Sequence, residues 1–144
     1  MTANAAGVDR LRVAVAGASG RMGRMLVEAV LASDDLMLGG ALDVAGSPAL
    51  GQDAAAFLGR ASGVTIEADL DAGLAHADVL IDFTRPEGTL VHLAACRRRG
   101  VKAVIGTTGF TEAQKARRAA HATEIAIVRA RDRGGGVKVG RKRL

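Results

Sequence analysis

The chain has 144 residues, of which 49% are hydrophobic and only 2% aromatic, so aliphatic side chains must build its core. Its single cysteine excludes an internal disulfide, and no run of about 18 uncharged apolar residues is present that would span a bilayer. The formal net charge of +5 is unevenly distributed: residues 1–128 carry 13 Lys/Arg and 14 Asp/Glu, whereas residues 129–144 carry 7 Lys/Arg and one Asp. These counts argue against a nucleic-acid-binding surface on the main body and predict a soluble, cytoplasmic protein with one principal domain.

Strand-like and helix-like patterns alternate from residue 12 to residue 128. A β-branched run at residues 12–16 is followed by apolar residues at helical spacing over residues 21–32. Further strands are predicted over residues 36–42, 64–66, 77–83, 101–105 and 125–128, and further helices over residues 53–58, 69–75, 86–99 and 111–122. This order predicts an α/β fold with a doubly wound, Rossmann-like parallel sheet and right-handed crossovers.

Two of the predicted helices carry local boundary signals. Pro86 stands at the first helical position, where its missing N–H is tolerated, and Gly100 follows the same helix after three arginines. Thr111 and Gln114 form a capping-box pattern ahead of the last helix. These residues predict where the two helices begin and where the first of them ends.

The loops after the strands are the candidate site, because ligands of a doubly wound sheet bind at the carboxyl ends of its strands. The first loop, residues 17–23, reads Gly-Ala-Ser-Gly-Arg-Met-Gly. It keeps the last two glycines of the dinucleotide-binding pattern and has Ala18 in place of the first. Since Gly20 lacks a Cβ, a pyrophosphate could approach the backbone and bind free N–H groups at the start of a helix. The alternative interpretation is an ordinary glycine-rich turn.

Asp43 stands at the end of the second strand, 20 residues beyond Gly23. A carboxylate there can accept hydrogen bonds from both ribose hydroxyls of an adenosine, although aspartates that merely end strands are common. Val44 follows it, so no arginine is placed directly after Asp43 to hold a 2′-phosphate. This favours NAD over NADP, with Arg21 and Arg60 as alternative phosphate ligands.

Two further loops, residues 82–88 and 106–110, place small hydroxyl residues and backbone donors after apolar strands. They suit contacts to a nicotinamide ribose and amide. We interpret Asp82 as a turn or cap acceptor, the more common role of a carboxylate that closes a strand, rather than as an acid or base. His92 and Cys96 are four residues apart, but two ligands without a third do not make a metal site, and we expect Cys96 to serve in packing.

Three motifs in order carry a resemblance to a known family: residues 15–23, Val-Ala-Gly-Ala-Ser-Gly-Arg-Met-Gly; residues 81–88, Ile-Asp-Phe-Thr-Arg-Pro-Glu-Gly; and residues 104–110, Val-Ile-Gly-Thr-Thr-Gly-Phe. Over residues 11–128 the chain closely resembles the N-terminal domain of the 4-hydroxy-tetrahydrodipicolinate reductases, long called dihydrodipicolinate reductases, of lysine and diaminopimelate synthesis. The resemblance implies NADH- or NADPH-dependent reduction of a cyclic dicarboxylate, with this domain holding the nicotinamide dinucleotide.

The resemblance also implies roles for individual residues. The stretch 17–22 would wrap the pyrophosphate, Asp43 would take the adenosine ribose, and residues 106–108 would lie along the nicotinamide half. The predicted cofactor-binding residues are Gly17, Ala18, Ser19, Gly20, Arg21, Met22, Asp43, Gly106, Thr107, Thr108 and Ala130. The family commonly has glutamate then arginine at positions 43 and 44, and many members use both cofactors.

The chain departs from the family after Val128. The family continues with a segment like Phe-Ala-Pro-Asn-Met-Ser-Val-Gly-Val-Asn-Val, with which residues 129–139 agree only at Ala130, Gly136, Val137 and Val139. The family's catalytic His-His-Arg-His-Lys-type stretch, its Pro-Ser-Gly-Thr substrate loop and most of its homo-oligomer interface lie in a second domain that we expect to be absent here. We therefore assign no catalytic residue to this chain and expect it to turn over nothing alone.

Residues 1–128 are thus predicted to be the dinucleotide-binding domain and residues 129–144 a basic, poorly ordered tail. The tail has three interpretations: the product of a shifted reading frame in a GC-rich gene, a basic arm for RNA or another polyanion, or a divergent family end. With the second interpretation, the alternative function is a non-catalytic redox sensor that binds the dinucleotide and uses its tail on nucleic acid.

Overall fold

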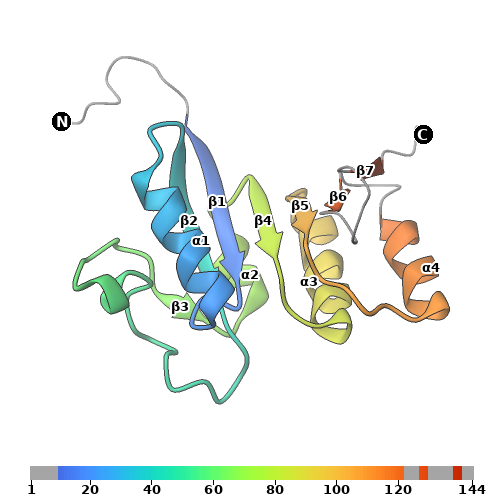
Figure 1. The fold of residues 1–144 in the computed structure, drawn as a ribbon, viewed down its shortest axis with the longest axis horizontal. Coiled ribbons are helices and arrows are strands. Elements are labelled where there is room, and N and C mark those ends of the chain that lie inside the picture. The colour runs from blue at the N-terminus through green and yellow to red at the C-terminus, as the bar shows by residue number, and fades with distance from the viewer. Residues whose placement is uncertain (1–9, 122–126, 130–137, 141–144) are drawn as a thin grey trace.

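The structure is a computed structural model that describes residues 10–121, 127–129 and 138–140. The described strands form one seven-stranded sheet in the order β3-β2-β1-β4-β5-β6-β7 (Figure 1). The strands are β1 (Leu11–Ala16), β2 (Leu36–Leu42), β3 (Ile66–Glu67), β4 (Val79–Asp82), β5 (Lys102–Ile105), β6 (Ile127–Arg129) and β7 (Lys138–Gly140). The first six are parallel to their neighbours, and β7 is antiparallel to β6. The predicted doubly wound α/β fold is confirmed.

Helices lie on both faces of the sheet, as the right-handed crossovers between parallel strands require. They are α1 (Arg21–Ala32), α2 (Leu70–Leu74), α3 (Pro86–Arg99) and α4 (Glu112–His121), with a short 3-10 turn, η2, at Ala56–Leu58. One core cluster joins α1 to the sheet through Val27 and Val30, and a second joins α2 and α3 to the opposite face through Leu74 and Leu93. Strands β1, β2, β4 and β5 are therefore covered from both sides, which explains their largely apolar sequences.

The local boundary signals act as predicted. Pro86 is at the start of α3, and Gly100 ends that helix in the left-handed conformation, with φ +66°. The Thr111 hydroxyl accepts from the Gln114 N–H at 3.2 Å, while the Gln114 side chain accepts from the Thr111 N–H at 2.8 Å. This reciprocal capping box fixes the start of α4.

Some predicted strands are longer than the observed ones. The apolar run 77–83 forms a strand only over Val79–Asp82, because Ala77 and Phe83 extend beyond the residues that pair with β1 and β5. The predicted strand 64–66 is displaced to Ile66–Glu67, since Thr65 instead bridges back to Asp53 in the preceding loop. Both differences arise at strand ends, where pairing partners rather than hydrophobicity decide the boundary.

Two parts of the segment that we expected to be poorly ordered are strand: Arg129 ends β6, and Lys138–Gly140 form β7 beside it. An antiparallel edge strand was not predicted. The other residues of 130–144 lie outside the described residues, so the domain division at residue 128 stays a prediction. Among the helices of the described ranges, none has the length and apolar character to cross a membrane.

Candidate functional site

The turn between β1 and α1 packs against its own backbone. Gly17 adopts φ +67°, a left-handed conformation that favours glycine, and the Gly20 N–H donates to its carbonyl at 3.0 Å. A Cβ at Gly23 would overlap the same Gly17 carbonyl, so the third glycine of the pattern permits close contact of helix and turn. Ala18 is buried in the core on the α1 side. The positive φ is thus needed at Gly17, and alanine is accommodated at the position after it.

The first turn of α1 offers free backbone donors. Its N-cap, Gly20, provides no side-chain cap, and no acidic residue lies in the first turn. The Arg24 N–H makes the first helical bond, to Gly20 at 2.9 Å, and nothing in residues 10–121, 127–129 or 138–140 accepts from the amides of Arg21, Met22 and Gly23. Unpaired amides at the positive end of a twelve-residue helix are suited to a phosphate group.

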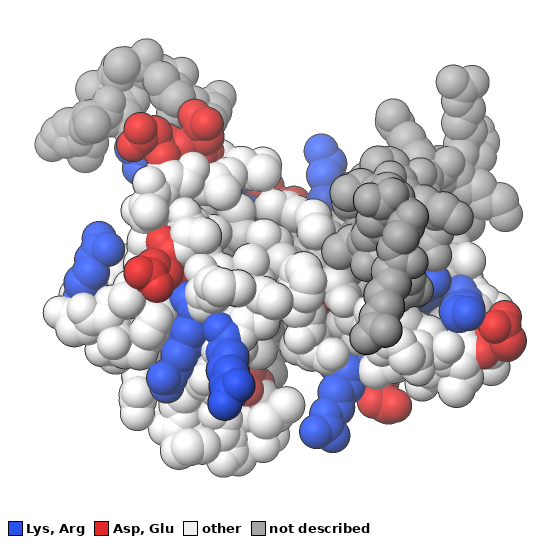
Figure 2. Space-filling view, in the orientation of Figure 1, with Lys and Arg blue, Asp and Glu red and all other residues white. Residues whose placement is uncertain are grey.

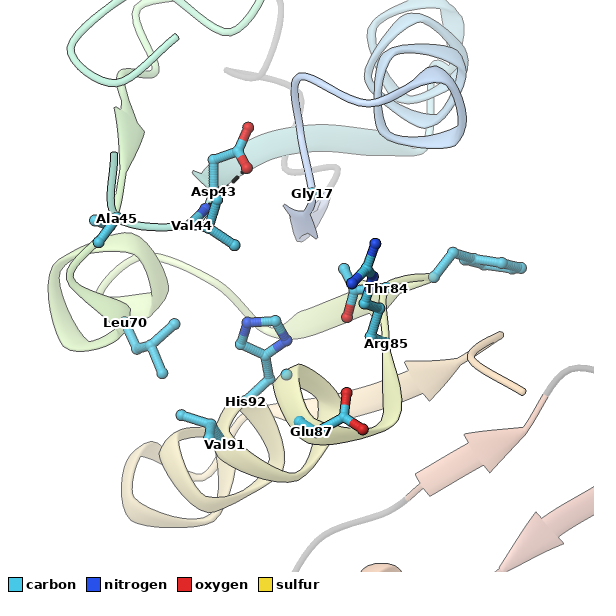
Figure 3. Close-up of a pocket in the computed structure, with 13 residues that line it drawn as sticks. Gly17, Asp43, Val44, Ala45, Leu70, Thr84, Arg85, Glu87, Val91 and His92 are labelled. Carbon is cyan, nitrogen blue, oxygen red and sulfur yellow. Dashed lines mark hydrogen bonds between the residues drawn. The ribbon is translucent and has the colours of Figure 1, made fainter. Parts of the chain in front are cut away.

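Asp43 joins the end of β2 to this turn. One of its carboxylate oxygens accepts from the Ser19 N–H at 3.2 Å and also from the Ser19 hydroxyl, and the other accepts from the Val44 N–H at 2.8 Å. The predicted residues Ser19 and Asp43, far apart in sequence, are therefore in contact. The carboxylate is fixed beside Gly17 at the mouth of a cavity (Figure 3).

That cavity has a volume of about 690 Å³ and lies at the carboxyl ends of β1, β2 and β4. Val44, Leu70 and Val91 give it apolar walls, whereas Asp43, Arg85 and His92 bring polar groups to it (Figure 3). The other lining residues are Gly17, Ala45, Ala68, Phe83, Thr84, Glu87 and Gly88. A largely apolar cavity with a few convergent polar groups is typical of a small-molecule site.

A buried aspartate–histidine pair lies beneath the cavity. Asp82, at the end of β4, is fully buried, and its carboxylate accepts from His92 Nδ1 at 2.7 Å and from the N–H and hydroxyl of Thr84 at 2.9 and 2.6 Å. Burial acts to raise the pKa of Asp82, but the hydrogen bond and charge of His92, with the Thr84 bonds, outweigh it and hold the pKa below its usual range. Asp82 is therefore the turn acceptor that the sequence predicts and, in addition, the partner of His92.

The loop after β5 is attached to the loop after β4. The Gly106 N–H donates to the Asp82 carbonyl at 2.7 Å, and the Phe83 ring occupies the space that a Cβ at Gly106 would need. Thr107 is buried, and its hydroxyl accepts from the Thr84 N–H at 3.0 Å and the Thr89 hydroxyl at 2.8 Å. Thr108 is exposed. Of the two adjacent threonines, only Thr108 presents its side chain to solvent.

Residues 11–132 match the family described as dihydrodipicolinate reductase, N-terminus. The chain belongs to this family. It is 68% identical over 118 residues to a 4-hydroxy-tetrahydrodipicolinate reductase of Cupriavidus taiwanensis, covering 82% of this chain and 44% of that protein. It is 59% identical over 137 residues to the reductase of Herminiimonas arsenicoxydans, covering 95% and 51%. The chain thus spans about half the length of the curated relatives it matches.

Solved structures give the same picture of the fold. A dipicolinate-bound dihydrodipicolinate reductase from Paenisporosarcina sp. TG-14 superposes with a TM-score of 0.67 and 26% identity, over 86% of this chain and 48% of that one. GenD2 from gentamicin A biosynthesis, solved in complex with NAD, gives a TM-score of 0.68 at 23% identity, over 85% and 35%. The second likeness supports the Rossmann-like fold alone.

Within this dihydrodipicolinate reductase domain, most of the predicted site residues lie in loops at the carboxyl edge of the sheet. Of these, Gly17 and Asp43 line the cavity and Ser19 contacts Asp43, whereas residues 106–108 belong to the loop after β5. Ala130 lies outside the described residues. None of these residues is tested as a ligand of the cofactor, so the set stays a prediction.

Sequence reasoning set His92 aside and did not single out Arg85. His92 lies four residues after Gly88 on α3, so both are on the helix side that lines the cavity. The four-residue spacing between Gly88 and His92 was the sequence signal that could have placed His92 at the site. Cys96, one turn further, is buried in the core and burial raises the pKa of its thiol to about 12, in keeping with the predicted packing role.

Charge on the visible face is mixed. Figure 2 shows Lys/Arg and Asp/Glu side chains scattered over the described part of that face, with uncharged surface between them. This distribution agrees with the near-neutral balance of residues 1–128. The described side chains of this face do not form a continuous basic surface of the kind that binds nucleic acid.

Proposed function

We propose that this chain is the cofactor-binding part of a 4-hydroxy-tetrahydrodipicolinate reductase and that it binds NADH or NADPH. The observation that carries the proposal is the meeting of two groups at one edge of the sheet: the first amides of α1, which have no acceptor within the described ranges, and the Asp43 carboxylate fixed by Ser19. Their chemistry matches the diphosphate and the ribose of an ADP moiety, because phosphates accept from N–H donors and ribose hydroxyls donate to carboxylates.

The adenosine half would occupy the cavity of about 690 Å³. Asp43 would accept from the ribose, and the walls formed by Val44, Leu70 and Val91 would bury the base. We therefore assign residues 83–88 to the adenosine half, which differs from our sequence-based interpretation of that loop as a nicotinamide contact. The reason is that the loop shares its cavity with Asp43.

The nicotinamide half would lie along residues 106–108, where the turn of Gly106 and the exposed Thr108 present backbone and hydroxyl groups. The bound cofactor supplies the hydride. This chain's own residues would bind and orient it: the α1 amides at the pyrophosphate, Asp43 at the ribose, and Thr108 near the ring. Binding and protonating the cyclic dicarboxylate belong to the remainder of the family's enzyme, so we propose no turnover by this chain alone.

We further propose a preference for NADH. The 2′-phosphate of NADPH would lie against the Asp43 carboxylate, and Val44 offers it no positive charge. Arg85 belongs to the loop after β4, across the cavity from Val44 (Figure 3). The lysine and diaminopimelate pathway, a cytoplasmic location and homo-oligomerisation of the complete enzyme are part of the same proposal.

Calorimetric titration of the 144-residue chain with NADH tests the proposal. Asp43→Ala should weaken binding about 10- to 100-fold, since it removes charge-assisted hydrogen bonds of about 1.5–3 kcal/mol. Asp78→Ala removes an aspartate at the opposite edge and should leave the affinity unchanged. The ratio of NADPH to NADH dissociation constants should fall in Asp43→Ala.

The proposal fails if the folded wild-type chain gives no saturable heat with either nucleotide, or if both variants weaken binding equally. Retention of RNA by the wild type that is lost on deleting residues 129–144 would favour the redox-sensor alternative. Normal reductase activity from this polypeptide alone would overturn the assignment of catalysis to another domain.

A further inference from the structure

We propose that Asp82 and Thr107 are positioning residues that couple the two halves of the site, so that a ligand of the adenosine cavity orders the loop that would hold nicotinamide. This inference rests on the proposed cofactor binding. It assigns to two buried residues a role that direct contact with the cofactor does not require.

The first step is the set of elements that Asp82 connects. One carboxylate oxygen accepts from Thr84, in the loop after β4, and the other accepts from His92, on α3. His92 lines the adenosine cavity, and its ring points into it in Figure 3. Because the carboxylate fixes Nδ1 as the donor, it also fixes which ring nitrogen faces the cavity.

The second step is the position of Thr107. It is 7% exposed, and its hydroxyl accepts from the Thr84 N–H and from the Thr89 hydroxyl of α3. The same hydroxyl lies 3.4 Å from both the carbonyl and a carboxylate oxygen of Asp82. Its hydroxyl is directed inward, so the role that we propose for the Thr107 side chain is to attach its loop to the Asp82 network.

The third step joins these contacts into one unit. A displacement of His92 or Thr84 by a ligand in the cavity acts on Asp82, and through Thr84 and Thr89 it acts on Thr107. Phe83, whose ring fills the space over Gly106, adds a packing contact between the same two loops. The chain of contacts is buried and short, which is the condition for energetic coupling between adjacent subsites.

ADP tests the coupling, because it fills the adenosine and pyrophosphate positions but carries neither the nicotinamide nor its ribose. Thr107→Val removes the hydroxyl and keeps the branched shape, and it should weaken ADP binding to the 144-residue chain about fivefold or more, as expected for coupled sites. Thr108→Val is the matched control: its exposed side chain has no part in the network, so this variant should weaken NADH binding and leave ADP binding unchanged.

Thr107→Ser restores the hydroxyl and should recover ADP affinity. Asp82→Asn should alter the ¹⁵N shifts of the His92 ring, a signature of the changed tautomer that loss of packing alone would not give. If the variants do not fold, hydrogen exchange of the wild type decides: ADP should slow exchange of the amides in residues 106–110, although it has no group that reaches them.

The coupling is overturned if ADP binds Thr107→Val as it binds the wild type, or if it leaves exchange of residues 106–110 unaltered. Failure of the proposed function looks different, because the wild type would then bind neither NADH nor ADP.

Discussion

The strand β4 has an aspartate at each end, and the two aspartates differ in burial, in hydrogen-bond partners and in the causes of their pKa shifts. Asp78, just before the strand, is partly exposed and pairs with Arg12 at 3.0 Å. Asp82, its last residue, is fully buried and is held by His92 and Thr84. The pKa of Asp78 is lowered chiefly by hydrogen bonding to Arg12, whereas that of Asp82 is lowered against the effect of burial.

The carboxylates at the amino and carboxyl edges of the sheet are satisfied by different kinds of partner. At the amino edge, the carboxylate is neutralised by an arginine, and the polar cavity of about 490 Å³ there also contains Arg99 and Lys102. At the carboxyl edge, Asp43 and Asp82 are satisfied by hydroxyls, amides and an imidazole, and the α1 amides have no acceptor among the residues that the structure describes. The carboxyl edge thus presents the amides and the carboxylate that the proposed cofactor would use.

The largest expected difference in stability is between the alanine variants of Asp82 and Asp78. Asp82→Ala should lower the free energy of unfolding by about 3 kcal/mol or more, because it leaves His92, Thr84 and Thr107 without their common partner. Asp78→Ala removes an exposed pair and one backbone bond and should cost about 1 kcal/mol. Urea unfolding followed by circular dichroism measures both. Equal losses would show that the edges do not differ as described.

Substitutions at two glycines near the β1–α1 turn should have different effects, one on stability and the other on NADH binding. Gly23→Ala should destabilise the chain by about 1–3 kcal/mol, since the new Cβ overlaps the Gly17 carbonyl and forces the backbone to move. In Gly20→Ala the new Cβ would lie 3.4 Å from the Gly17 oxygen, an ordinary van der Waals distance, so the stability should be nearly unchanged. The same Cβ should weaken NADH binding, because it hinders the approach of the pyrophosphate. Thermal unfolding and calorimetry on the same samples distinguish them. A stable Gly23→Ala would contradict the packing argument.

Asp53 is a carboxylate whose pKa is lowered by hydrogen bonds alone, and so it can be compared with Asp78. Hydrogen bonds from the Ser62, Ala55 and Gly63 amides and the Ser62 hydroxyl lower its pKa to about 2. Because the folded pKa lies below the unfolded one, its contribution to stability is present above about pH 4 and is lost as the pH falls to about 2. The stability difference between wild type and Asp53→Asn should therefore shrink over that window. A difference that stays constant down to pH 2 would exclude this assignment.

The smallest loss of stability among the expected losses is at the start of α4, directly after the loop that follows β5. Thr111→Ala breaks the capping box and should cost about 1 kcal/mol, with a similar or smaller loss for Gln114→Ala. If the two bonds act as a unit, the double variant should lose less than the sum of the single losses. Strict additivity would show that each bond acts alone.

The sequence was sufficient for features that depend on neighbours in the chain. Pro86, Gly100 and the Thr111–Gln114 pair marked helix ends correctly, and the run Leu36–Leu42 ended where β2 ends, because capping chemistry and apolar runs act locally. The glycine turn and Asp43 could be placed at one edge by topology alone, since parallel strands bring their carboxyl ends together.

What the sequence could not supply depends on side-chain direction. His92 looked like a scattered histidine, and its pairing with Asp82 follows only from how α3 packs on β4. Thr107 and Thr108 are equivalent in sequence, yet one is turned into the protein and the other out of it. The antiparallel strand β7 has no apolar pattern, so pairing with β6 was not foreseeable from its residues.

The buried thiol of Cys96 has a practical consequence for a chain that contains neither tryptophan nor tyrosine. With a pKa of about 12, only about one molecule in ten thousand carries the thiolate at pH 8, and that thiolate is shielded by the core between α3 and β5. Reaction with a thiol reagent therefore reports the fraction of time that α3 separates from the sheet. A single native residue thus provides a measure of local opening beside the cavity that His92 lines, with no introduced label.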